Sequence, residues 1–385
     1  MKRVLLGDVV QINPSTKVSK GQSVKFISMD KLDPFTKIPN GYEERKFSSG
    51  AKFTNGDTLL ARITPCLENG KTAFVDFLDD LEVAAGSTEF VILRNIEGLT
   101  DSGYIYYLSI SPAFRDYAIK SMVGTSGRQR VQNDVLAKME LNLPLLNQQK
   151  KIADILSSLD EKIELNRRMN ETLEQLGQAL FRHYFVDNPE AKSWDDVKVG
   201  ELVDIKGGGT PSTKDSSFWG GDIVWSSPRD LANQRCHFLM RTDKTITKQG
   251  LLKISSGMLP AGTLLLSSRA PIGYIAFAGV DMAINQGYIA FLPKAKLSNY
   301  FMYFWLKNNI QKIKDSANGS TFLEISKTAF RNIYIKQPNQ LLHNKFQYEV
   351  MIILDKIRDN EAEIYSLTSL RDSLLPKLIS GEIEV

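Results

Sequence analysis

Basic and small polar residues gather in a few loops of this chain of 385 residues. The stretch Lys206–Gly273 contains nine basic residues and four acidic ones, which gives it a charge of +5 in a chain whose total is +4. The loop Gly124–Arg130 adds two arginines, and its counterpart later in the chain is Asn318–Thr321. Lys and Arg neutralise phosphates, whereas Arg, Ser and Thr can also hydrogen-bond to base edges. Any one such residue is commonly a solvated surface residue, but the group as a whole favours contact with nucleic acid.

The candidate DNA-contacting residues all have a basic or hydroxyl side chain and come from both halves of the chain. They are Arg62, Lys71, Ser126, Arg128, Arg130, Lys214, Arg229, Arg269, Ser320, Thr321 and Lys327. The aromatic residues Trp219, Trp225 and Tyr300 are expected in the core instead.

Several short motifs approach a catalytic pattern, but each one is incomplete. Residues 33–35, DPF, lack one proline of the Asn-Pro-Pro-Phe motif of adenine methyltransferases. The glycine run at 207–209 leads to Pro211 rather than to the Gly-Lys-Ser/Thr of a phosphate loop. Residues 160–162, DEK, have the letters of a nuclease motif, yet they lie in a long helix and are predicted to be a solvated face. Three histidines and two cysteines are scattered without metal-ligand spacing. We therefore expect a chain that is not an enzyme and binds no metal or cofactor itself.

Two long stretches must position these loops. Residues 147–185 contain no proline and one glycine, and their apolar residues recur at alternating spacings of three and four, which produces one narrow stripe along a helix. Residues 346–378 repeat the layout, so that Ile163 and Asn166 correspond to Ile357 and Asn360, 194 residues later. We predict that the two helices pair within one chain in antiparallel orientation, with the asparagines fixing the register at some cost in stability. Ordinary core packing of each helix and self-association of chains are the alternatives.

The residues predicted to form this helix-pair interface follow the apolar stripe of both stretches. They are Ile152, Leu156, Leu159, Ile163, Asn166, Leu173, Leu180, Phe346, Val350, Ile353, Ile357, Asn360, Ile364, Leu367 and Leu374.

The segments before the two long helices also repeat. The pattern V-x-x-G-x-x-V-x-I at residues 4–12 recurs at 197–205. Short β-rich runs between Gly, Asn and Asp turns, followed by a helix at Tyr104–Met122, predict a mixed α/β (α+β) domain in each half. The predicted boundaries are 1–146 for the first domain, 147–186 for the central helix, 187–338 for the second domain and 339–385 for the distal helix. The distal helix is expected to end near Pro376.

A chain with two copies of one domain implies a bipartite or symmetric target, and duplex DNA is such a target.

Composition adds little, since 42% hydrophobic and 24% charged residues are ordinary for a soluble globular protein. No apolar run approaches the roughly 20 residues of a membrane span, and the N-terminal apolar segment is short for a signal peptide. Cys66 and Cys236 lie far apart, which suits a reducing compartment. We therefore expect a cytoplasmic protein without a membrane partner.

The segment Gly207–Leu231, GGGTPSTKDSSFWGGDIVWSSPRDL, resembles the opening of a target-recognition domain in specificity subunits of Type I restriction–modification systems. Such domains typically have a Gly-Gly-Thr-Pro-Ser run, an aromatic-Trp pair, Ile-x-Trp and Asp-Leu. The stretches QQKKIA at 148–153 and LRDSLLPKLISGEI at 370–383 are similar to the helical regions of that family. The resemblance covers the whole chain in the order domain, helix, domain, helix. The first domain departs from it, with INPSTKVSK where the second has IKGGGTPSTK.

The resemblance implies two target-recognition domains separated by an intramolecular coiled coil of two antiparallel helices. It implies a non-catalytic subunit that recognises a bipartite DNA site, with one half-site in the major groove for each domain. Two methyltransferase subunits and, in the full complex, restriction subunits would dock on it, and S-adenosylmethionine and ATP would bind those partners. A free-standing DNA methyltransferase or nuclease, and a coiled-coil scaffold that never binds DNA, are the alternatives.

Overall fold

The computed structural model describes residues 2–125, 127–233, 236–269, 271–293, 296–318 and 323–385. Its mixed α/β architecture confirms the predicted fold class. The chain divides into two compact units, unit 1 (Met1–Glu164 and Tyr365–Val385) and unit 2 (Leu165–Ile364). Each unit contains one globular part and a stretch of each of two long helices. None of the described helices is long and apolar enough to cross a bilayer.

The globular part of unit 1 is built from small sheets and short helices. Its strands are β1 (Lys2–Leu5), β2 (Val10–Ile12), β3 (Ser23–Ile27), β4 (Glu43–Lys46), β5 (Ala51–Phe53), β6 (Thr58–Ala61), β7 (Thr72–Phe74), β8 (Ala84–Gly86), β9 (Phe90–Asn95) and β10 (Glu140–Leu143). Its helices are α1 (Leu6–Val9), η1 (Met29–Lys31), α2 (Ser102–Ile110), α3 (Pro112–Lys120) and α4 (Asn133–Leu136). The strand orders are β1-β10, β2-β9-β6-β7 and β4-β3-β8-β5.

The globular part of unit 2 has the same kinds of elements. Its strands are β11 (Asp196–Lys198), β12 (Ile205–Lys206), β13 (Trp219–Ser226), β14 (Phe238–Leu239), β15 (Lys244–Ile246), β16 (Leu264–Ser267), β17 (Ile275–Ala278), β18 (Met282–Ile284), β19 (Tyr288–Phe291) and β20 (Tyr334–Lys336). Its helices are η3 (Pro189–Ser193), α6 (Val199–Leu202), η4 (Ser216–Phe218), α7 (Pro228–Asn233), α8 (Lys248–Leu251), α9 (Asn299–Asn308), α10 (Ile310–Asp315) and α11 (Lys327–Arg331). The strand orders are β11-β20, β12-β19-β16-β17-β14 and β15-β13-β18.

The two units share most of their strand pairing, which confirms the predicted internal repeat, although unit 2 adds β14 to one sheet and, among the described residues, has no strand in place of β5 in the other. The antiparallel pair β1–β10 corresponds to β11–β20, and the parallel pair β3–β8 corresponds to β13–β18. The repeated glycines have the same role in both units. A Cβ atom at Gly7 would lie 3.0 Å from Ala137 Cβ, and one at Gly200 would lie 2.8 Å from Arg331 Cβ. The short helix after the first strand therefore closely approaches the segment before the last strand.

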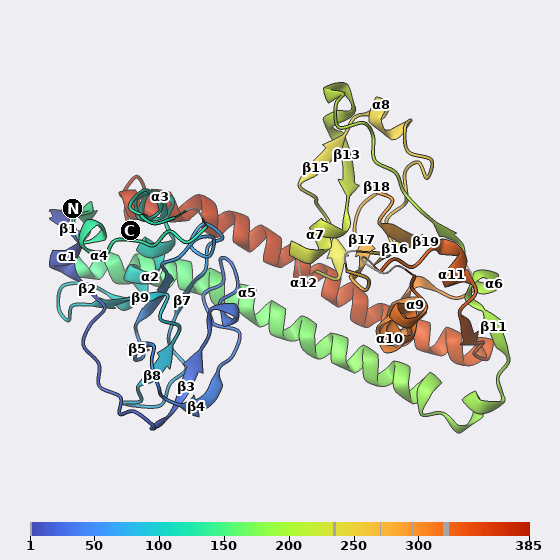
Figure 1. Ribbon diagram of the computed structural model, residues 1–385, viewed down its shortest axis with the longest axis horizontal. Helices are drawn as coiled ribbons and strands as arrows, with labels where there is room; N and C mark the ends of the chain where they lie inside the picture. The colour runs from blue at the N-terminus through green and yellow to red at the C-terminus, as the bar shows by residue number, and fades with distance from the viewer. Residues whose placement is uncertain (1, 126, 234–235, 270, 294–295, 319–322) are drawn as a thin grey trace. The chain divides into compact units, whose positions relative to one another are not determined.

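The long helices pair within unit 1. They are α5 (Leu146–Phe181), which the π-helical turn η2 (Arg182–Val186) continues, and α12 (Gln340–Ser380). Arg371 Nη1 of α12 donates to Asp160 Oδ1 of α5 at 2.7 Å. Apolar side chains of both helices, among them Leu156 and Leu375, belong to the same core cluster as α2 and β9. The helix pair and the globular part of unit 1 therefore share one core (Figure 1).

The helices also pair within unit 2, where buried asparagines link them. Asn166 Nδ2 donates to Glu363 Oε2 at 2.8 Å, and Asn360 Nδ2 donates to Asn170 Oδ1 at 2.7 Å. Residue numbers rise along α5 while those of the partners fall along α12, so the helices are antiparallel. The predicted intramolecular antiparallel pair is thus confirmed.

The residues predicted for the helix-pair interface are all removed from solvent to some degree. The buried ones are Ile152, Leu156, Ile163, Asn166, Phe346, Val350, Ile353, Ile357 and Asn360. The half-buried ones are Leu159, Leu173, Leu180, Ile364, Leu367 and Leu374.

Two helix boundaries differ from the prediction. The single helix expected at Tyr104–Met122 is two helices, because Ser111 ends α2 and caps α3, whose first residue is Pro112. Proline fits the first turn of a helix but not its interior. The expected end of α12 near Pro376 is also wrong, since the helix continues to Ser380. Leucines on both sides of this proline are buried in the core of unit 1, and their burial offsets the roughly 3 kcal/mol that an internal proline costs.

Asp160 is not solvated, contrary to the prediction for residues 160–162. Its side chain is 5% exposed and accepts hydrogen bonds from Arg371 of α12 and Tyr107 of α2, each at 2.7 Å. A buried carboxylate is tolerated only when it is paired, so these two donors are required. The sequence contained the signal, because Asp160 lies four residues after Leu156 and three before Ile163, on the buried side of α5.

Gly177, the single glycine of α5, allows the helix to pack closely on α9. A Cβ atom at this position would lie 2.4 Å from Cζ of Phe304, whose ring is fully buried. The Phe304 ring also contacts the rings of Phe181 and Phe346, with centroids 6.4 and 6.0 Å away. Because the core is close-packed, the ring cannot move aside without cost.

We expect Gly177→Ala to destabilise the protein, although alanine is the better helix former by about 1 kcal/mol. Overpacking costs roughly 1–3 kcal/mol, so the net loss in free energy of unfolding should reach up to about 2 kcal/mol. Thermal unfolding of Gly177→Ala, alone and combined with Phe304→Leu, measures the effect, because the shorter leucine should remove the cost. Ala179→Gly, at an exposed position of α5, is the control for helix propensity. A Gly177→Ala variant whose free energy of unfolding rises by the full helix-propensity gain of about 1 kcal/mol would show that Phe304 does not resist the added methyl group.

Candidate nucleic-acid interface

In unit 1 the loop after β6 crosses the loop between α3 and α4. The backbone of Arg130 forms short β-bridges to Ile63 and to Val123. Next to them, Val131 N donates to the Arg62 carbonyl at 2.9 Å. The crossing therefore brings together Arg62 and Arg130, two of the residues predicted to contact DNA.

Most of the predicted basic side chains in unit 1 support these loops. Arg130 donates to both carboxylate oxygens of Glu89, through Nε at 2.9 Å and Nη2 at 2.6 Å. These bonds hold the pKa of the Glu89 carboxyl below its usual range. Arg62 and Lys71 each donate to a backbone carbonyl, at 3.2 and 2.9 Å. Arg128, by contrast, is exposed and has no ion-pair partner among the residues that the structure describes.

Unit 2 contains the same crossing. The backbone of Glu324 forms β-bridges to Arg269 and to Asn318, and Arg269 Nη1 lies 3.6 Å from the Glu324 carboxylate. Glu324 lies 194 residues after Arg130. Unit 2 therefore keeps the crossing, but an acidic residue stands where unit 1 has an arginine. Lys327 is exposed at the start of α11, and its ammonium lies against Gly207. The predicted residues Ser126, Ser320 and Thr321 lie outside the described residues.

The glycine run at 207–209 supports the loop that carries Lys214. A Cβ atom at Gly208 would lie 1.9 Å from the Ile284 carbonyl oxygen, so no larger residue fits there. Gly209 N donates to the same carbonyl at 2.9 Å, and Trp225 Nε1 donates to the Gly209 carbonyl at 3.1 Å. The run is therefore a backbone support, and Lys214 is exposed on the loop beyond it.

Arg229 is exposed on α7, and its neighbour Asp230 fixes that helix. The Asp230 side chain is buried, and its Oδ2 accepts hydrogen bonds from Ser227 N at 2.8 Å and Ser227 Oγ at 2.9 Å. Its Oδ1 accepts a hydrogen bond from Asp243 N at 3.1 Å. The buried carboxylate thus ties α7 to two neighbouring segments and sets the position of the exposed arginine.

Sequence reasoning missed two polar contacts that join the globular parts to α5. Tyr107 Oη donates to Asp160 Oδ2 at 2.7 Å in unit 1, and Tyr303 Oη donates to Glu174 Oε1 at 2.9 Å in unit 2. Burial raises the pKa of both phenols, which therefore remain protonated donors. The two tyrosines occupy equivalent positions of α2 and α9, in a Tyr-x-x-Tyr spacing that both halves share. That repeated spacing is the signal that identifies them.

Comparison with known proteins finds relatives of both halves. The pattern of the Type I restriction modification DNA specificity domain matches residues 1–175 and again residues 191–366. The chain is 27% identical over 403 residues to the Type I restriction enzyme HindI specificity subunit of Haemophilus influenzae, with 85% of this chain and 86% of that protein covered. It is also 35% identical over 176 residues to the Type I restriction enzyme MjaIX specificity subunit of Methanocaldococcus jannaschii, with 44% of this chain and 41% of that protein covered. Among solved structures, the S subunit of a Type-I restriction-modification system from M. genitalium has the same fold, with a TM-score of 0.56, 17% identity and coverage of 98% of this chain and 96% of that one.

Proposed function

Because the chain belongs to the family of Type I restriction modification DNA specificity domains, which it contains twice, we propose that it recognises a bipartite DNA site, one half with each globular part. The family assignment confirms the predicted specificity subunit. It also confirms that the chain is not itself an enzyme, since specificity subunits of this family are non-catalytic.

The observation that carries the proposal is the crossing of two loops at equivalent places in both units. Each crossing is held by backbone bridges and by an arginine–glutamate pair, Arg130 with Glu89 and Arg269 with Glu324. Nearby on the chain, each unit has an exposed basic residue, Arg128 or Lys327. A rigid loop that presents a cation fits a phosphate contact, and residues of the same loops would then meet base edges in the major groove.

The helix pair supplies the surface for protein partners. Leu176 of α5 and Leu370 of α12 lie 194 residues apart at equivalent positions, and their side chains are 49% and 46% exposed. A repeated exposed leucine on paired helices suits two copies of one partner, so we assign two methyltransferase subunits to these helices and restriction subunits to the full complex. S-adenosylmethionine and ATP would bind those partners in the cytoplasm. The domain boundaries that we propose are 1–146, 147–186, 187–338 and 339–385.

Deletion of this chain should abolish methylation of one two-part DNA sequence across the host genome. Sequencing of methylated adenines in cells with and without the chain measures this directly. A free-standing methyltransferase would instead bind S-adenosylmethionine as an isolated chain, which calorimetry with the purified chain detects. A scaffold without a role in DNA recognition would leave the methylated sequence unchanged.

Arg128→Ala should weaken binding to the cognate duplex and reduce the slope of log K against log salt concentration by about one, since each lost phosphate contact releases about one counterion fewer. Arg130→Ala is the matched comparison, because its guanidinium is already neutralised by Glu89 and should change the slope less. Titrations at four or more salt concentrations provide the slopes. Equal slopes for Arg128→Ala and the wild type would place Arg128 outside the DNA contact.

The length of the helix pair should set the spacing between the two half-sites. Both long helices pass through both units, so four residues are inserted into each, after Glu164 in α5 and after Ile364 in α12. The insertion adds about 6 Å of helix, which is somewhat under two base pairs. The methylated sequence should keep both halves and gain one or two unspecified pairs between them. Insertion into α5 alone should lose activity, because it puts α5 out of register with α12; an unchanged spacer after the double insertion would show that the helices do not set it.

A further inference from the structure

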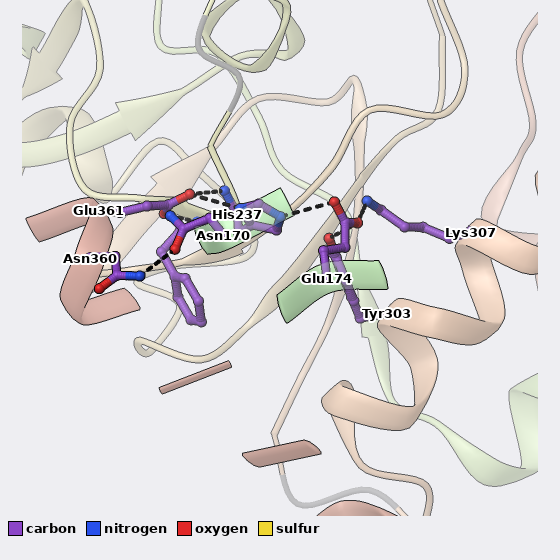
Figure 2. Close-up of polar contacts among 8 residues, drawn as sticks. Asn170, Glu174, His237, Tyr303, Lys307, Asn360 and Glu361 are labelled. Atoms are coloured by element: carbon purple, nitrogen blue, oxygen red, sulfur yellow. Dashed lines mark hydrogen bonds and ion pairs between the residues drawn. The ribbon is translucent and has the colours of Figure 1, made fainter. Parts of the chain in front are cut away.

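In unit 2 a carboxylate of α12 holds the backbone of the segment that leads into β14. Glu361 Oε1 accepts hydrogen bonds from His237 N at 2.7 Å and from His237 Nδ1 at 2.9 Å. Glu361 Oε2 accepts a hydrogen bond from Phe238 N at 2.9 Å. Figure 2 shows this carboxylate facing His237 from the helix. Two adjacent peptide groups and one side chain are thus bound to a single residue of the helix pair.

The other face of the His237 ring meets α5. His237 Nε2 lies 3.1 Å from Glu174 Oε2, so the imidazole is placed between carboxylates of both long helices. Glu174 also accepts the hydrogen bond from Tyr303 Oη and forms an ion pair with Lys307, both on α9 (Figure 2). The side chains of His237 and Glu361 are only 15% and 12% exposed. We refer to His237, Glu174 and Glu361 as the His237 clamp.

The His237 clamp resists movement of this segment relative to the helices. A shift of the segment would leave the Glu361 carboxylate facing fewer donors in a site that water scarcely reaches. Buried charges without partners are strongly disfavoured. The hydrogen-bonded position of the segment is therefore lower in free energy than a displaced position. Helix α12 also cannot rotate about its axis without breaking the bonds to both peptide groups. The clamp therefore couples the position of the segment to the geometry of the helix pair.

This segment follows α7, which carries the exposed Arg229. The buried Asp230 of α7 accepts hydrogen bonds from Ser227 and Asp243, and these bonds hold the helix in place. β14 then pairs with β17 at the edge of the five-stranded sheet. The clamp thus lies where the chain passes from a helix with an exposed basic residue into the framework of the sheet.

Unit 1 has a counterpart that is built from different residues. Lys37, in the loop between η1 and β4, donates through Nζ to Ser157 Oγ of α5 at 2.9 Å. The same ammonium lies over the rings of Phe74 and Tyr107, 5.2 and 5.5 Å from their centroids. Tyr107 is the equivalent of Tyr303, which adjoins the His237 clamp. In both units, then, a nitrogen of a side chain between two elements, His237 or Lys37, lies within hydrogen-bond distance of α5 beside the same tyrosine.

We propose that Glu361 and His237 are positioning residues for the DNA half-site that unit 2 recognises, and that Lys37 has this role for the half-site of unit 1. The inference rests on the proposed function and deepens it. The helix pair does more than connect the two globular parts, because the contacts of His237 and of Lys37 each fix how one part lies on its own stretch of the helices. Loss of one contact should therefore misplace the loops of one unit only.

The test measures, for each half of the site, the ratio of methylation at matched sequences to methylation at sequences with one mismatch. The full chain is co-expressed with its methyltransferase partner, and the genome is sequenced for methylated adenine. Glu361→Gln presents an amide NH₂ to a peptide N–H that needs an acceptor. It should lower the ratio in one half at least about fivefold, the lower end of what one misread base pair costs. His237→Gln should lower the ratio for the same half by less, since both peptide groups still reach Glu361. Lys37→Met should lower the ratio for the other half.

Glu349→Gln is the matched control, because Glu349 lies on α12 in unit 2 and accepts a hydrogen bond from Tyr184 at 3.1 Å rather than from the clamped segment. It should leave both ratios unchanged. A smaller amount of folded chain changes the ratios of both halves alike, so a general loss of stability cannot imitate a change in one half. An equal loss of the ratio in both halves overturns the positioning role. So does an unchanged ratio in Glu361→Gln, or an unchanged ratio in His237→Gln. A wild-type chain that gives no two-part methylated sequence contradicts the proposed function itself, and the inference fails with it.

Discussion

Carboxylates of the long helices that are enclosed by hydrogen-bond donors are the constraint on which the rest of the structure depends. Asp160 is enclosed between α2 and α12 and is paired with a tyrosine and an arginine, whereas Glu361 is bonded to two peptide groups and an imidazole. A hydrophobic stripe alone tolerates sliding and rotation, because apolar contacts have little direction. Removing a charge from its donors in a dry site is far more costly. The apolar stripe therefore associates the helices, and the carboxylates fix where each globular part lies on them.

The two units keep the same framework but not the same charges. Gly7 and Gly200 allow the same close approach of backbone, and the parallel pairs β3–β8 and β13–β18 have the same place in the sheets. The position of Arg130 is occupied by Glu324 in unit 2, yet each loop crossing has its own ion pair. Backbone geometry is thus preserved where any other residue would clash, while the ion pair at each crossing is formed by residues at different positions of the repeat.

The parts of the fold that could be predicted from the sequence are those set by local spacing. Alternating apolar steps of three and four identify α5 and α12, and the 194-residue offset identifies the repeat. The burial of Asp160 could not be inferred with equal force, because a charged residue on a helix is buried only when a donor from a distant element reaches it. Arg371 and Tyr107, 211 and 53 residues away, are those donors. Among the predicted DNA contacts, Arg128 and Lys327 are exposed, but Arg62 and Lys71 donate to backbone carbonyls, which composition and spacing cannot reveal.

The departure of the first domain from the family pattern now has a structural basis. In unit 2 the loop after β12 begins with glycines that lie against the Ile284 carbonyl, and Trp225 holds it in place. In unit 1 the loop after β2 begins with Asn13, whose backbone N–H donates to the Ile92 carbonyl at 2.8 Å and whose Oδ1 accepts from Ile92 N at 2.9 Å. One loop is thus fixed on the end of strand β18 and the other on strand β9. Since base recognition depends on where a loop places its side chains, two units with one framework and different loop anchors are suited to recognise different sequences. A common framework with separate anchors is what an asymmetric bipartite site requires.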